Sequence, residues 1–220
     1  MSLLRAREFF LGAYHDLPNV LFIGSFLLGS LTGYLPLVWL SLGLILNGAV
    51  VAGGQGLLHL LFPTWSQVSM PSSSACSVLG PGPYGAPNAN LTTVAPSYWL
   101  SSAVFFAVFS IYNSVRVAFR PAAEGVSQDK VDTRRAFSLS VLVIGAAFFA
   151  LVMARGFSGC ETLLGGALGA AIGAGIAIAY WHMLDACGSG TIPDILQVVS
   201  NMAPAGSADR VPVVCTPASA

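Results

Sequence analysis

Charged residues are scarce in this chain. Asp, Glu, Lys and Arg together make up 8% of its 220 residues, whereas 55% of the residues are hydrophobic. Soluble domains usually carry about 25% charged residues. The shortage argues against an ordinary soluble globular domain and indicates an integral membrane protein.

Charges are missing altogether from three long stretches, residues 17–115, 136–154 and 162–184. A helix needs roughly 20 residues to cross the hydrocarbon core of a bilayer. The stretches also lack the polar face that repeats at helical period in a soluble helix. We therefore expect an all-α fold, a multispan bundle of transmembrane helices.

The sequence also lacks the patterns that indicate a nucleic-acid, metal or cofactor site or a signal peptide. The formal net charge is zero and no basic stripe with interleaved aromatic residues is present, so we expect no nucleic-acid partner. The histidines and cysteines show no ligand spacing for a metal, and we predict neither a metal nor a cofactor. Arg5, Arg7 and Glu8 interrupt the apolar stretch that a signal peptide would need. Residues 1–17 are instead predicted to form an amphipathic segment at the membrane interface.

Proline and glycine divide the first apolar stretch, residues 18–62, which is too long for one crossing. The residue before a proline is biased away from helix, so Pro36 predicts a break between two spans. The expected spans cover residues 18–34, 36–53, 97–119, 136–155 and 161–182. The count is five, or six if residues 54–62 form a separate half-span.

Two segments between or after the spans are rich in serine, proline and glycine. Residues 63–96 are therefore expected to form an irregular loop, and residues 186–220 a flexible tail. Residues 97–185 hold the last three predicted spans.

Basic residues gather between the third and fourth predicted spans, at Arg116, Arg120, Lys130, Arg134 and Arg135. Loops with an excess of Lys and Arg stay in the cytosol. This orientation predicts a cytosolic tail and places residues 63–96 on the other side of the membrane.

The non-cytosolic side holds two candidate modifications. Asn90-Leu91-Thr92 is a glycosylation sequence, and Asn90 is either modified or a chance match. Cys76 and Cys160 fall on the same side, where an oxidising compartment would permit a disulfide. Two free thiols are the alternative.

Small residues mark one side of the last predicted span. Gly165, Gly169 and Gly173 recur at every fourth position, a spacing that lets another helix approach closely. The partner is either a helix of the same chain or a second copy of the protein.

The arrangement of the last three spans resembles a known family. Pro96-Ser97 opens the third span, Ala154-Arg155 ends the fourth, and "GFSGCETLLGG" leads into the fifth. This pattern resembles the core of the type 2 phosphatidic acid phosphatase (PAP2) superfamily. The resemblance implies a PAP2-like topology in the C-terminal half. It also implies a chemistry with a histidine nucleophile, a second histidine, an orienting aspartate and basic groups that hold phosphate.

The residues that carry the family's chemistry are replaced in this sequence. Tyr98 and Trp99 stand where the family has glycine and histidine, and Arg155 matches the arginine. Glu161 occupies the position of the nucleophilic histidine and Gly165 that of the aspartate. The resemblance therefore implies a fold and argues against the activity.

The motifs "APSYW", "GCET" and the tail "ACG…DI…VCTP" resemble small multispan proteins encoded by large nucleocytoplasmic DNA viruses of eukaryotes. This resemblance implies residence in a virion internal membrane or a host endomembrane. The implied partners are membrane lipids, further copies of the chain, and other membrane or capsid proteins.

Three functions follow, of which we favour the first. It is a non-enzymatic membrane protein on a degenerate lipid-phosphatase-like scaffold, with a structural or assembly role. The alternative is a divergent lipid phosphatase or another lipid-modifying enzyme. The third is a channel or transporter, which normally needs ionisable groups inside its spans.

The predicted topology can be tested by cysteine-accessibility labelling in sealed vesicles. We expect probes introduced at Ser127 and Ser73, in a background without the native cysteines, to label from opposite sides. Labelling of both from one side would mean that residues 97–119 do not cross the membrane.

Overall fold

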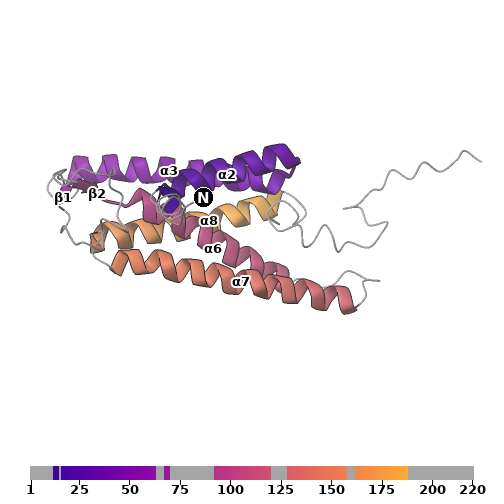
Figure 1. Ribbon diagram of the computed structural model, residues 1–220. Helices are drawn as coiled ribbons and strands as arrows, with labels where there is room; N and C mark the ends of the chain where they lie inside the picture. Colours follow the sequence, from indigo (N-terminus) through magenta and orange to yellow (C-terminus); the bar gives the residue numbers. More distant parts are fainter. Residues whose placement is uncertain are drawn as a thin grey trace, which may run out of the picture.

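The computed structural model describes residues 12–14, 16–62, 67–69, 92–119, 128–157 and 162–187. Five long helices dominate this part of the chain: α2 (Leu17–Thr32), α3 (Leu35–Leu61), α6 (Tyr98–Ala118), α7 (Gln128–Phe157) and α8 (Leu163–Cys187). They lie side by side as an elongated bundle (Figure 1). Two short strands, β1 (Gln67–Ser69) and β2 (Thr92–Val94), pair antiparallel beside one end of the bundle.

Four of the helices, α3, α6, α7 and α8, are long and apolar enough to cross a membrane. Much of the described exterior is apolar, including side chains such as Leu31, Val143 and Leu151, which are 83%, 68% and 66% exposed. Such an exterior suits lipid better than water. The prediction of a multispan helical membrane protein is confirmed at this level.

Five full spans were expected, whereas four of the described helices are long and apolar enough to cross a membrane. Helix α2 has 16 residues, which at 1.5 Å per residue gives about 24 Å, less than the roughly 30 Å of a hydrocarbon core. Helix α3 continues through residues 53–56 to Leu61, so residues 54–61 are part of α3 and do not form a separate half-span. In lipid, backbone groups need intrahelical partners, and this requirement favours a continuous helix despite the glycines.

Two more expectations are corrected. Helix α7 begins at Gln128, eight residues before the predicted span at 136, because its polar first turns extend beyond the apolar part that hydropathy detects. The loop at residues 63–96 was expected to be irregular, but it contains β1 and β2. Each strand has only three residues, which is too short for the alternation of apolar and polar residues that would predict a strand.

Helices α2 and α3 form a tight hairpin. Gly33 ends α2 in the left-handed region with φ 68°, a conformation that favours glycine. A Cβ added at Gly29 would lie 2.9 Å from the backbone nitrogen of Val38. Both glycines therefore permit the close return of the chain.

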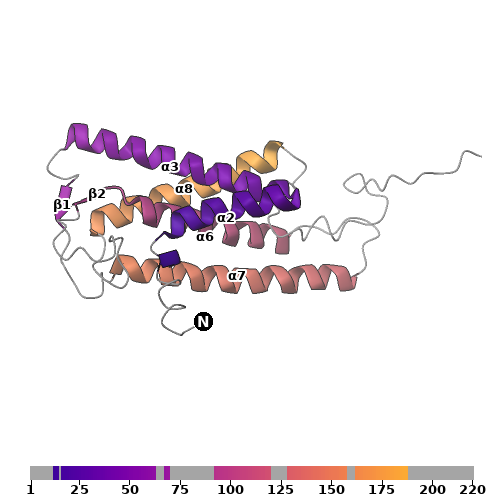
Figure 2. The same cartoon turned by 45° about the horizontal axis from the view of Figure 1, so that its top comes forward.

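Helix α6 is the centre of the bundle. In its most apolar stretch 67% of the residues are buried, against 17% in the corresponding stretch of α7. In both views α7 lies on the opposite side of the bundle from α3 (Figures 1 and 2). Phe106 of α6 meets Phe148 of α7 with ring centroids 5.9 Å apart. On the other side, the core cluster formed with α3 and α8 contains Leu40, Leu44, Phe105, Phe109, Ala177, Tyr180, Trp181 and Leu184.

The small-residue ridge of α8 packs on α6 of the same chain. A Cβ added at Gly169 would lie 2.6 Å from the carbonyl oxygen of Ser97, and one at Gly173 would overlap the carbonyl oxygen of Ser101. Gly165 is also buried and faces Ala95 and Thr162. The ridge therefore serves internal packing between α8 and α6.

Replacing Gly169 by leucine should push α8 away from α6, because the new side chain would meet backbone that cannot move aside. Overpacking costs about 1–3 kcal/mol, so we expect the unfolding midpoint in detergent to fall by on the order of 5 °C. The matched control is Gly175→Leu, because a Cβ at Gly175 has no atom within 4 Å. Equal midpoints for the two variants would contradict this packing.

Candidate functional site

The segment that resembles a phosphatase motif begins α6. Ser97 is the N-cap residue of this helix, and its hydroxyl accepts a hydrogen bond from the backbone N–H of Leu100 at 3.2 Å. Serine is a preferred N-cap because its oxygen satisfies a backbone donor that the helix leaves unpaired. The Ser97 side chain is buried and acts here as a structural cap.

The beginning of α8 lies directly against this cap. The backbone N–H of Ser97 donates to the carbonyl oxygen of Gly165 at 2.9 Å. Gly169 faces the Ser97 carbonyl one turn further along α8. The fold thus brings Ser97 beside Gly165, two positions that the resembled pattern assigns to one site.

Trp99, at the position of a catalytic histidine in the resembled family, is buried with 6% of its surface exposed. Its indole N–H donates to the carbonyl oxygen of Tyr14 at 3.1 Å, and the two rings lie 5.2 Å apart. The neighbouring Tyr98 is 42% exposed and packs beside Gly48 of α3. Trp99 therefore ties the segment before α2 to the beginning of α6.

A buried polar cluster joins α3 to α6 one turn further along. Ser101 donates to Asn47 Oδ1 at 2.9 Å, and Asn47 Nδ2 donates to the Ser102 hydroxyl at 3.4 Å. All three side chains are at most 1% exposed. Hydrogen bonds of this kind hold transmembrane helices together.

The extension of α3 brings further polar residues to this end of the bundle. Gln55 Nε2 donates to the carbonyl oxygen of Pro96 at 2.8 Å. His59 follows four residues later on the same helix, so it lies at the same end as Pro96 and Ser97. His59 was not predicted to lie near this segment, because residues 54–62 were left open as an extension of the second span or a separate half-span. The absence of any charged residue through residue 62 was the available signal.

Several predicted site residues lie outside the described part of the chain: Glu161, Asn90, Cys76 and Cys160. Arg155 belongs to the last turn of α7, but its side chain is also outside the description. The Cys76–Cys160 disulfide, the Asn90 modification and any role of Arg155 and Glu161 stay predictions. Within the described residues, no group of three or more His, Cys, Asp or Glu side chains is placed to hold a metal ion.

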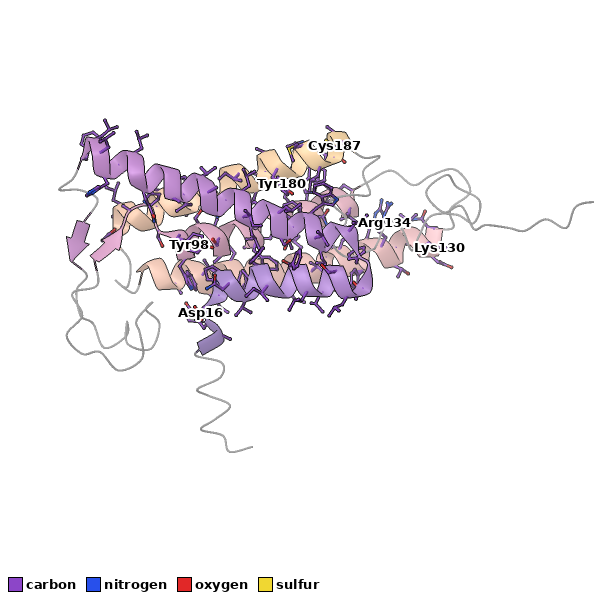
Figure 3. The ribbon with its side chains drawn as sticks, turned by 90° about the horizontal axis from the view of Figure 1, so that it is seen from above. Asp16, Tyr98, Lys130, Arg134, Tyr180 and Cys187 are labelled. Carbon is purple, nitrogen blue, oxygen red and sulfur yellow. The ribbon has the colours of Figure 1, made fainter. Side chains whose placement is uncertain are left out.

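The two ends of the bundle differ in character. Tyr98 lies toward one end, and Lys130, Arg134 and Cys187 lie toward the other (Figure 3). At the end that holds Ser97 and Trp99, Gln55 bonds to the Pro96 carbonyl, the Ser97 hydroxyl caps its own helix, and the Trp99 indole bonds to the Tyr14 carbonyl. These contacts stabilise the bundle, and an indole has no basic lone pair to accept a proton.

The Asn47 cluster should contribute measurable coupling between α3 and α6. In a double-mutant cycle of Asn47→Ala and Ser101→Ala, we expect a coupling energy of about 0.6 kcal/mol, the average for such bonds in membranes. Unfolding in detergent measures it. The matched cycle pairs Asn47→Ala with Ser114→Ala, whose hydroxyl instead bonds within α6 to the Ser110 carbonyl. Coupling of the same size in both cycles would refute the specific contact.

Comparisons of the chain with protein-family models, with curated proteins and with solved structures found no match.

Proposed function

We propose that this protein is a non-enzymatic membrane scaffold with a structural or assembly role, built on a degenerate lipid-phosphatase-like arrangement. The observation that carries the proposal is the position of Trp99. The side chain that replaces a catalytic histidine is buried, and it donates a hydrogen bond to the Tyr14 carbonyl. A group held in this way stabilises the fold and cannot accept a proton from a substrate.

The surroundings of Trp99 support the same proposal. Ser97 caps α6, its backbone N–H bonds to Gly165, and the Pro96 carbonyl accepts from Gln55. Each of these polar groups therefore has a partner within the protein. Close packing of α8 on Ser97 and Ser101 leaves no room between the two helices for even a Cβ at Gly169 or Gly173.

We place this scaffold in a virion internal membrane or a host endomembrane. The support is the resemblance of the motifs around Trp99 and in the tail to viral multispan proteins, together with the apolar exterior of the helices. Its proposed partners are membrane lipids, copies of itself, and other membrane or capsid proteins. Fractionation of infected cells and purified particles tests this placement.

One observation favours the alternative, a divergent lipid-modifying enzyme. Helix α3 carries His59 to the end of the bundle that holds Ser97, and Arg155 lies in the last turn of α7. A histidine and an arginine are groups that phosphoryl chemistry uses. The resembled family supplies its histidines from other segments, so this alternative requires a different arrangement.

The decisive measurement is phosphate release from phosphatidic acid by the purified protein in lipid vesicles. We expect the wild type to release no more than Arg155→Ala, because loss of a nucleophile or its base costs several orders of magnitude in rate. Multiple turnover that disappears in Arg155→Ala would overturn the scaffold proposal. His59→Ala and Glu161→Gln would then identify the reacting group.

A further inference from the structure

Five side chains at the basic end of the bundle form one continuous cluster, the basic-end cluster. Three come from the last turns of α6 and two from α8: Tyr112, Asn113, Arg116, Trp181 and His182. None of them belongs to the segment that resembles a phosphatase motif. They lie at the opposite end of α6 from Ser97 and Trp99.

The contacts within the cluster are specific. The guanidinium carbon of Arg116 lies 5.3 Å from the centre of the Trp181 ring, a cation–π geometry. Tyr112 meets Trp181 edge to face at 5.0 Å. The Tyr112 hydroxyl and His182 Nε2 are 2.9 Å apart and share a hydrogen bond.

Asn113 is incompletely satisfied. Its Oδ1 accepts a hydrogen bond from the Trp181 indole N–H at 3.3 Å. Its Nδ2 is buried, and no hydrogen-bond acceptor among the described residues contacts it, although the residue is only 1% exposed. A buried donor without an acceptor destabilises the folded protein. The cluster therefore lacks an acceptor at this point.

Arg116 supplies an exposed positive charge beside that donor. The two residues are three positions apart on α6 and so are neighbours on its surface. Among the described residues Arg116 forms no ion pair, whereas Arg135 of α7 lies 4.0 Å from Asp132. A cation and an unsatisfied donor side by side are what an oxyanion binds.

The surface next to the cluster is apolar. Helices α7 and α8 both pack on α6 but have few contacts with each other. Near the cluster, Val115 of α6 is partly exposed and Phe119, which follows the last turn, is 77% exposed. An acyl chain can cover these two side chains while its headgroup stays near Arg116.

We infer that the basic-end cluster binds the phosphate of an anionic phospholipid in the adjacent leaflet. Arg116 provides the charge, and the hydrogen-bonded pair of Tyr112 and His182 provides a further donor. Asn113 Nδ2, which lies beside Trp181 without an acceptor, is the donor that a phosphate oxygen would satisfy. Basic sites between transmembrane helices recognise lipid headgroups in this way.

The test is native mass spectrometry of the detergent-purified protein with phosphatidylglycerol or phosphatidylcholine added at equal concentration. We expect the wild type to retain phosphatidylglycerol in preference to phosphatidylcholine. Arg116→Gln should weaken phosphatidylglycerol binding about tenfold, as expected for loss of a charged hydrogen-bonding partner. The matched control Arg135→Gln removes an exposed charge at the same end and should change binding less than about twofold.

Two further measurements keep the result interpretable. Arg116→Lys keeps the charge and should retain most of the preference, which separates headgroup binding from loss of the stacking on Trp181. Tyr112→Phe keeps the ring and should lower the affinity by a smaller factor than Arg116→Gln. Size-exclusion chromatography checks that each variant remains folded.

Three outcomes would overturn the inference. Equal retention of the two lipids by the wild type would show that the protein does not recognise the anionic headgroup. Equal losses in Arg116→Gln and Arg135→Gln would show diffuse attraction by the basic end. Displacement of phosphatidylglycerol by millimolar inorganic phosphate would show a site for a free anion and not for a lipid.

Discussion

The bundle depends on the close approach of α8 to α6. At Gly169 and Gly173 the surface of α8 meets the carbonyl groups of Ser97 and Ser101, and no room remains for a Cβ. Association of helices in lipid gains little from burying apolar surface, since the lipid is apolar too. Close backbone packing therefore takes the place that hydrophobic burial has in water. It also holds the aromatic residues Tyr180 and Trp181 against α6 further along the two helices.

Polar side chains reinforce the packing among α3, α6 and α8. Asn47 links α3 to Ser101 and Ser102, and Tyr180 donates from α8 to the Trp39 carbonyl at 2.7 Å. No water is available in the bilayer core to satisfy such groups. Each one specifies which helix lies beside which.

The polar groups at the two ends of α6 differ in whether they have partners within the protein. At the beginning of α6, Ser97 and Trp99 are engaged by neighbouring backbone groups, which supports a scaffold. At the end of α6, Asn113 keeps an unsatisfied donor beside the exposed Arg116, which supports a ligand. A protein of this kind would use one end for its own cohesion and the other for its contact with the membrane.

The sequence by itself determined the membrane class, the approximate spans and the small-residue ridge of α8. Length and hydrophobicity determine the first two features, because a bilayer tolerates few unpaired backbone groups or charges. The four-residue spacing of glycines determines the third. Only the tertiary structure decided that α6 receives the ridge, that Trp99 is buried against Tyr14, and that Asn113 lies beside Trp181. These features join residues far apart in the chain, and the spacing of small residues along α8 does not say which helix packs against it. The choice is made by the fit of complementary surfaces in three dimensions.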